Sequence, residues 1–169
     1  MRLTVEDGSG IPDANSYIDE RDADGYLPSS LAARWLALSE EERADRLAAA
    51  SGFVDSSFRW LGERSGREQG MCWPRTGVRA IPGDSVPAQV RRASLFALEI
   101  LMAGGLDALR PREKQSVRRE RFDITETEYF EPEAGEDGKS PYARLNNLLR
   151  GLYLAEGTGG FAAARVERA

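Results

Sequence analysis

The spacing of apolar residues along the chain predicts a mainly helical protein. After Ser39, apolar residues recur every three or four positions as far as Phe58, which is the spacing of one face of an α-helix. Ser39 and Glu42 match the Ser-x-x-Glu capping box, in which the hydroxyl and the carboxylate satisfy unpaired backbone N–H groups of the first turn. We therefore predict an amphipathic helix over residues 39–58.

A broader apolar stripe predicts a second long helix at the centre of the core. Pro87 suits a first helical turn, and Gly104 and Gly105 end the pattern. Between them the stripe consists of Val90, Ala93, Ser94, Phe96, Ala97, Leu98, Ile100 and Leu101. Such a wide apolar face is typical of a helix that its neighbours cover on several sides.

Three shorter helices complete the pattern. A last core helix begins at Pro141 with Ser140 as its cap, and its apolar face consists of Leu145, Leu148, Leu149 and Leu152. Two more short helices are predicted over residues 19–27 and 31–38. Ser29 or Ser30 is the expected cap of the second one.

Glycine and proline interrupt the helical pattern in two places. Residues 1–18 are predicted to form an extended segment. Residues 62–85 are predicted to form a long loop, and Trp60 and Trp73 are expected to anchor its two ends to the body. Loops of this length in compact domains are often functional.

Alternating polar and apolar residues predict an extended arm or β-hairpin at about residues 115–133, before the last core helix. Glycines then separate that helix from the end of the chain. The predicted fold class is therefore mainly α: a small helical bundle with this arm and a flexible C-terminal tail. We assign residues 1–156 to one helical domain and residues 157–169 to the tail.

The composition is that of a soluble globular protein, with 41% hydrophobic and 30% charged residues among 169. The net charge is −5, whereas proteins that coat nucleic acid usually carry a basic surplus. No apolar run approaches the roughly 20 residues that a membrane span needs. Without an apolar signal segment at the N-terminus, we expect a protein made in the cytoplasm and no membrane partner.

The inventory of reactive side chains argues against an enzyme. The sequence contains no histidine, the commonest general base and a frequent metal ligand. Cys72 is the single cysteine, and its apolar neighbours indicate a packed thiol rather than a nucleophile. Asp22 with Asp24, or Glu126 with Glu128, could form an acid pair, but Glu126 and Glu128 lie on an alternating strand and are expected to face solvent. We therefore expect no catalytic residues, no metal and no cofactor.

Charge is divided along the predicted arm. Residues 110–121 carry six basic side chains, and residues 123–137 carry seven acidic side chains and no basic one. Two oppositely charged strands could pair within one subunit, or they could pair between neighbouring copies of a ring, in which each copy presents one face to a different face of the next. We expect subunit contacts through Arg118, Arg119, Arg121, Glu126 and Glu128. The alternative is that the basic run contacts phosphates, with Phe122 and Tyr129 as stacking partners.

The C-terminal tail has two interpretations. Its side chains with the potential to dock are Phe161, Arg165, Val166 and Arg168. The tail is either a tether that folds in a partner's groove or a frayed terminus. The residues alone leave both interpretations open.

Several motifs carry a resemblance to a known family. They are the opening VEDGSGIPDANSYI, then Trp60 with Gly62, then CWPRTGV at residues 72–78, and Val86-Pro87 before the central helix. Together with the leucine-rich last helix, they cover residues 1–154 and resemble small phage proteins labelled DnaT-like single-stranded DNA-binding. The Trp-Pro-Arg-Thr-Gly stretch between two helices is the most specific of them.

These proteins are similar in plan to the head–tail connectors, or adaptors, of tailed phages and gene-transfer particles. That resemblance implies a virion structural protein that forms a ring of twelve copies beneath the portal protein. The ring would sit in the virion neck after assembly in the host cytoplasm. It would meet a head-closure (stopper) or tail-side protein, and DNA would pass through it without sequence-specific binding. The tail would dock on the portal.

From the sequence we therefore expect a head-to-tail adaptor, with a single-stranded DNA-binding module as the alternative. The net charge of −5 weighs against the alternative. So does the lack, in the sequence, of a segment that reads as an aromatic-rich basic groove.

Overall fold

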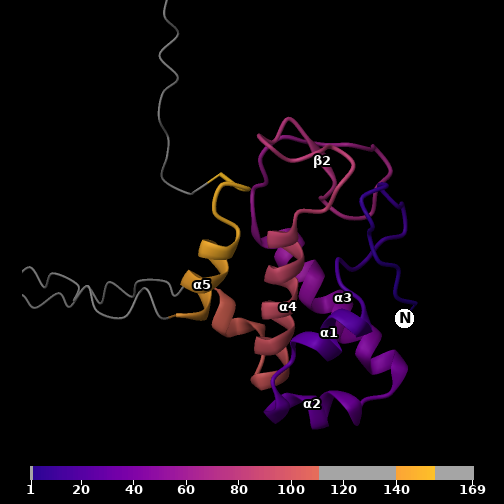
Figure 1. Cartoon of the computed structure of the whole chain (residues 1–169), viewed down its shortest axis with the longest axis vertical. Coiled ribbons are helices and arrows are strands. Elements are labelled where there is room, and N and C mark those ends of the chain that lie inside the picture. Colours follow the sequence, from indigo (N-terminus) through magenta and orange to yellow (C-terminus); the bar gives the residue numbers. More distant parts are fainter. Residues whose placement is uncertain (1, 111–139, 155–169) are drawn as a thin grey trace, which may run out of the picture.

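The computed structural model describes residues 2–110 and 140–154, which form a mainly helical body around two long helices. α3 (Glu40–Ser57) and α4 (Ala88–Ala103) pack against each other along their length (Figure 1). Leu47 and Val54 of α3 and Val90 and Leu98 of α4 are fully buried. The prediction of a mainly α protein with an amphipathic helix and a central apolar helix is confirmed.

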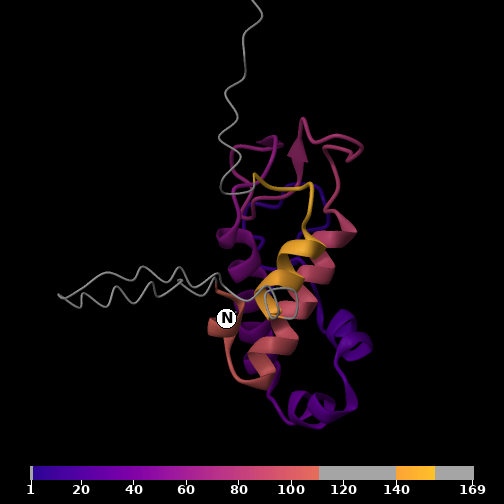
Figure 2. The same ribbon diagram turned by 90° about the vertical axis from the view of Figure 1, so that its left-hand side faces the viewer.

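The shorter helices surround this pair. α1 (Glu20–Tyr26) and α2 (Ser29–Leu36) both pack on α4, and α2 lies at one end of the molecule. α5 (Pro141–Leu148) and a short 3-10 helix (Leu106–Leu109) also pack on α4 and on each other. Figure 2 shows α5, in yellow-orange, lying along α4.

Local hydrogen bonds explain where the helices begin. The predicted capping box of α3 is confirmed, since Glu42 N donates to Ser39 Oγ at 3.3 Å and Ser39 N to Glu42 Oε2 at 2.8 Å. Ala143 N donates to Ser140 Oγ at 3.1 Å, so the predicted cap of α5 is confirmed too. The predicted cap of the second short helix is wrong: α2 begins at Ser29 itself, and Pro28 occupies the cap position.

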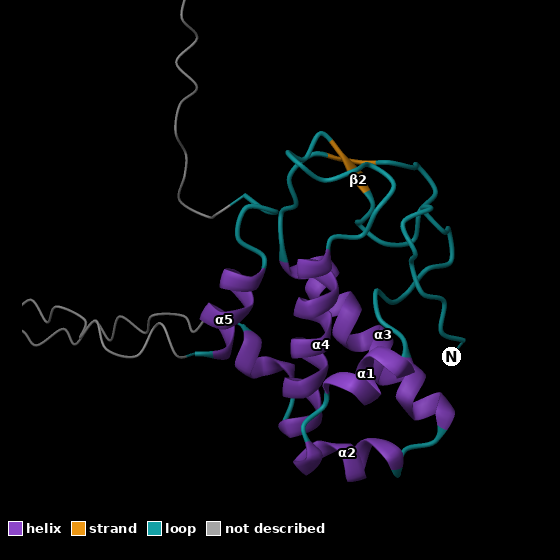
Figure 3. Ribbon diagram, viewed as in Figure 1, coloured by secondary structure: helices purple, strands orange, loops and turns teal. Residues whose placement is uncertain are grey.

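The segment predicted as a long loop contains a small β-hairpin that the sequence pattern did not reveal. β1 (Glu63–Arg64) pairs in antiparallel fashion with β2 (Arg75–Thr76), at the opposite end of the molecule from α2 (Figure 3). Gly62 precedes β1 with a φ of 70°, and a Cβ there would lie 2.1 Å from the Thr76 carbonyl oxygen. Only glycine fits this close approach without strain.

Both tryptophans that were predicted to anchor this segment are buried. Trp60 is 7% exposed and Trp73 is 0% exposed, and their rings meet edge to face with centroids 5.8 Å apart. The extended N-terminal segment packs beside them, with Gly70 N donating to Ile11 O at 3.0 Å.

The arm predicted at about 115–133 and the tail at 157–169 lie outside the described residues. Within residues 2–110 and 140–154, no helix combines the length and the apolar character needed to cross a membrane.

Candidate functional site

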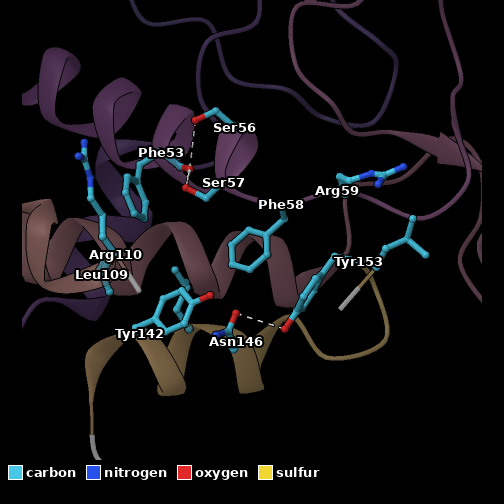
Figure 4. A pocket seen from close by; sticks show the side chains of 12 residues that line it. Phe53, Ser56, Ser57, Phe58, Arg59, Leu109, Arg110, Tyr142, Asn146 and Tyr153 are labelled. Atoms are coloured by element: carbon cyan, nitrogen blue, oxygen red, sulfur yellow. Dashed lines mark hydrogen bonds between the residues drawn. The ribbon is translucent and has the colours of Figure 1, made fainter. Parts of the chain in front are cut away.

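A cleft of about 580 Å³ lies between the end of α3, the 3-10 helix and α5. Four aromatic side chains line it: Phe53, Phe58, Tyr142 and Tyr153. Figure 4 shows Phe58 in the middle of this group, between Phe53 and Tyr153. We call it the aromatic cleft.

Backbone pairing between distant segments builds one wall of the aromatic cleft. Leu61 N donates to Leu152 O at 2.9 Å, and Leu154 N donates to Arg59 O at 2.8 Å. This pairing holds Phe58 against Tyr153, with ring centroids 4.7 Å apart and planes tilted by 59°. Two rings that are far apart in the sequence therefore form one surface.

The aromatic rings are half-buried, while the floor beneath them is closed. Leu109 and Leu145 are buried and form part of the lining. Leu154, at the rim, is 47% exposed, which is unusual for a large apolar side chain in this molecule. An apolar floor with partly exposed rings can hold a flat ligand by stacking.

The polar groups of the aromatic cleft are already oriented. The Tyr153 hydroxyl donates to Asn146 Oδ1 at 3.2 Å. Partial burial raises the pKa of Tyr153 above its ordinary value, so the phenol stays neutral near pH 7. The hydroxyls of Ser56 and Ser57 donate back to helix carbonyls, at 2.8 Å to Gly52 O and 2.6 Å to Phe53 O.

Two arginines give the aromatic cleft a positive rim. Arg59 and Arg110 are exposed and lie on opposite sides of the aromatic group in Figure 4. No aspartate or glutamate is among the described residues that line the cleft. Arg110 Nε is 3.6 Å from Asp107 Oδ1, but both side chains are largely in solvent, where such a pair is weak.

Most of the site residues predicted from the sequence lie outside the described residues. These are Arg118, Arg119, Arg121, Glu126 and Glu128 of the split-charge arm, and Phe161, Arg165, Val166 and Arg168 of the tail. The basic run, however, begins at Arg110, which lines the aromatic cleft.

The other candidates have structural roles. Asp22 completes the capping box of α1, whose cap residue is Asp19, and pairs with Arg91 at 2.8 Å, while Asp24 accepts a hydrogen bond from Trp35 Nε1 at 2.8 Å. They do not form an acid pair. Burial raises the pKa of the Cys72 thiol, against the opposing effect of Arg64 Nη2 at 3.5 Å.

The aromatic cleft itself is not predicted by the sequence pattern. Its rings come from α3, from the turn after α3, from α5 and from the segment after α5. One signal was available: Phe53 and Phe58 lie five positions apart within the helix predicted over residues 39–58, so they cannot both belong to one narrow helical face. Their partners on α5 could not be named without the fold.

The described residues thus define a small helical protein with an aromatic, arginine-flanked cleft. Over residues 1–169 the chain matches the family described as "Putative DnaT-like ssDNA binding protein". The protein belongs to this family. No curated protein and no solved structure matches it at a significant level.

This match confirms the DnaT-like resemblance and corrects the expected function. The expectation of a virion structural protein, a head–tail connector, is wrong, because the matching family is described by single-stranded DNA binding and not by a place in a particle. The net charge of −5 leaves room for a local basic patch, and the described residues that line the aromatic cleft include two arginines and no acidic side chain.

Proposed function

We propose that this protein binds single-stranded DNA in the aromatic cleft. The observation that carries the proposal is the placing of four half-buried aromatic rings between two exposed arginines, with no acidic side chain among the described lining residues. Family membership supports the same class of ligand.

The aromatic rings supply the larger part of the binding energy. Stacking of a base on an aromatic side chain contributes about 1–3 kcal/mol per base and accepts every base, because each has a π-face. Phe58 and Tyr142 present faces of this kind in the aromatic cleft. Binding should therefore depend little on sequence.

The arginines supply the contact with the backbone. Arg59 and Arg110 flank the rings, so phosphates on either side of a stacked base can meet a guanidinium. Each phosphate neutralised on a single strand adds roughly 0.7 to the slope of log affinity against log salt. With two arginines, the expected slope from the cleft is modest, about 1.4.

The same geometry selects single strands over duplex. Bases in a duplex are stacked on each other and paired, so their faces are not available to a protein ring. The net charge of −5 also disfavours the approach of a densely charged duplex.

Fluorescence anisotropy with a labelled oligo-dT strand tests the proposal. The wild-type chain should bind the strand, and its affinity should fall as salt is added. It should bind a matched duplex more weakly than the single strand. Tyr142→Ala combined with Arg110→Gln should lower the affinity at least tenfold, by removing one stacking face and one phosphate contact.

Arg34→Gln is the matched control. Arg34 is exposed on α2, away from the aromatic cleft, so its loss changes the net charge by the same amount as the loss of Arg110. Equal weakening by both variants would show that only the overall charge matters and would overturn the cleft as the site. No binding by the wild-type chain at low salt would overturn the function itself.

A further inference from the structure

A second hollow, of about 420 Å³, lies on the other side of α5 from the aromatic cleft. Arg92 from α4 and Arg144 from α5 line it, together with Leu95 and Leu148. Residues of α1 close its far side. We call it the arginine hollow.

α5 separates the two sites and faces both. Tyr142, Leu145 and Asn146 line the aromatic cleft, while Arg144 and Leu148 line the arginine hollow. In Figure 2, α5 runs between the α3 side and the α1 side of the molecule. A strand that leaves the aromatic cleft over α5 arrives at the arginine hollow.

The outer surface of α5 is free of negative charge. The segment 140–154 contains Arg144 and Arg150 and no acidic residue. Both arginines and Asn147 are exposed. A phosphate backbone that crosses this helix therefore meets cations and an amide, and no carboxylate of this segment.

The guanidinium of Arg144 is held in place. Its Cζ lies 4.3 Å from the centroid of the Phe96 ring, and Phe96 is buried. A guanidinium stacked on a ring keeps its N–H edges free for an oxygen ligand, and its fixed position lowers the entropy cost of binding.

Asp22 is itself among the residues that line the arginine hollow, and Glu99 contacts Tyr26, another lining residue, but both carboxylates already have partners. Asp22 accepts from Arg91 at 2.8 Å and from the backbone N–H of Asp19 at 3.2 Å. Glu99 accepts from the Tyr26 hydroxyl at 3.2 Å. Among the described residues, no ion pair within 4.0 Å involves Arg92 or Arg144.

We infer that the arginine hollow is a second subsite for the same DNA strand and binds phosphates of its backbone. The inference rests on the proposed function of the aromatic cleft. A helix is about 10–12 Å across with its side chains. At duplex spacing, a single strand covers this width with roughly three phosphates. The subsite should therefore serve only strands longer than the aromatic cleft alone can hold.

A length series tests the inference. Anisotropy is measured with oligo-dT of about 4, 8 and 16 nucleotides, the range of sizes that small single-strand binders cover. The wild-type affinity should increase with length. Arg92→Gln with Arg144→Gln should leave the shortest strand unaffected and weaken the longest roughly 25-fold, about fivefold for each exposed ion pair lost. The salt slope for the longest strand should fall by about 1.4.

Arg144→Lys separates charge from structure. Lysine keeps the cation but not the planar stack on Phe96, so the long strand should bind more weakly than it binds the wild type and more tightly than it binds Arg144→Gln. Thermal unfolding of each variant checks that the fold is intact, and Arg34→Gln controls for the loss of one positive charge elsewhere on the surface. The second subsite is wrong if the double variant binds strands of every length as the wild type does. It is also wrong if the double variant loses affinity equally for strands of every length.

The same series tells the two hypotheses apart. If no strand binds the wild-type chain, the proposed function and this inference both fall. If Tyr142→Ala leaves binding unchanged but the arginine variants weaken it, the arginine hollow is the primary site, and both the aromatic cleft and the second-subsite inference that rests on it fall.

Discussion

The molecule has two aromatic groups that touch each other but differ in what surrounds them. Tyr17, Trp60 and Trp73, the buried aromatic cluster, are 0%, 7% and 0% exposed. The rings of the aromatic cleft are half-buried, although the ring centroids of Phe58 and Trp60 are only 5.5 Å apart. Neighbouring rings of similar chemistry therefore form a core on one side and an open surface on the other.

Polar contacts mark the same boundary. In the buried aromatic cluster, the Tyr17 hydroxyl accepts from Trp73 N at 3.0 Å and donates to Asp55, which also accepts from Cys72 N at 2.8 Å. Within residues 2–110 and 140–154, the rings of the aromatic cleft take part in one side-chain hydrogen bond, from the Tyr153 hydroxyl to Asn146. Aromatic residues that complete a polar network stabilise the fold. Those left with open faces are the candidates for binding.

The largest expected effect comes from Trp73→Ala in the buried aromatic cluster. Removing a fully buried tryptophan leaves a cavity and should lower the free energy of unfolding by about 3–5 kcal/mol, as measured by urea denaturation. Tyr142→Ala in the aromatic cleft is the comparison and should cost roughly 1 kcal/mol. Equal losses would mean that the cleft is part of the core.

Tyr17→Phe tests the polar network of the buried aromatic cluster alone. The variant keeps the ring but leaves the Trp73 N–H and one Asp55 oxygen without the hydroxyl, so the free energy of unfolding should fall by about 2 kcal/mol. Tyr153→Phe removes a hydroxyl at the cleft surface and should cost less than about 1 kcal/mol, because water replaces the bond. If Tyr153→Phe lowers the free energy of unfolding more than Tyr17→Phe does, the hydroxyl in the aromatic cleft stabilises the fold more than the one in the buried aromatic cluster.

Phe58→Leu tests the open faces of the aromatic cleft. Leucine fills much of the space but cannot stack a base, so the affinity for oligo-dT should fall by about 5- to 30-fold, or about 1–2 kcal/mol. Phe58→Tyr keeps the ring and should bind nearly as the wild type does. If both variants lose affinity equally, the effect reflects packing against Trp60 and Tyr153 and not stacking.

The sequence predicts the helices and the buried aromatic cluster better than it predicts the aromatic cleft. The periodicity of α3 and α4, the capping box at Ser39 and the cap at Ser140 are local signals, and each has the predicted structure. Trp60 and Trp73 could be assigned to the core because large aromatics beside a glycine-rich loop usually anchor it. These features depend on near neighbours in the chain.

The aromatic cleft could not be predicted, because it depends on pairing between segments far apart. Phe58 and Tyr153 meet only since residues 59–61 run beside residues 152–154, and no local pattern encodes that pairing. The hairpin at Glu63 and Thr76 was missed for a similar reason: two-residue strands are too short to alternate. Net charge, a sum over the whole chain, likewise concealed a basic rim.

The smallest expected effect concerns Cys72, at the edge of the buried aromatic cluster. Burial raises the pKa of its thiol, so the folded chain holds the proton more tightly than the unfolded chain, whose thiol has a pKa near 9.0. The stability that the neutral thiol contributes is therefore complete below about pH 9 and is lost as the pH rises through the folded pKa. Tyr17, whose pKa burial also raises, adds to the same alkaline loss.

Thiol reactivity isolates Cys72 from Tyr17. At pH 8 a disulfide reagent should modify native Cys72 several-fold more slowly than the thiol of the urea-unfolded chain, because less thiolate is present. Arg64→Gln should slow the reaction further, since the guanidinium beside Sγ lowers the thiol pKa. Cys72→Ala should flatten part of the decline in stability above pH 9 and leave oligo-dT binding unchanged. If the native thiol reacts as fast as the unfolded one, Cys72 is open to solvent, as the rings of the aromatic cleft are, and does not belong with the buried aromatic cluster.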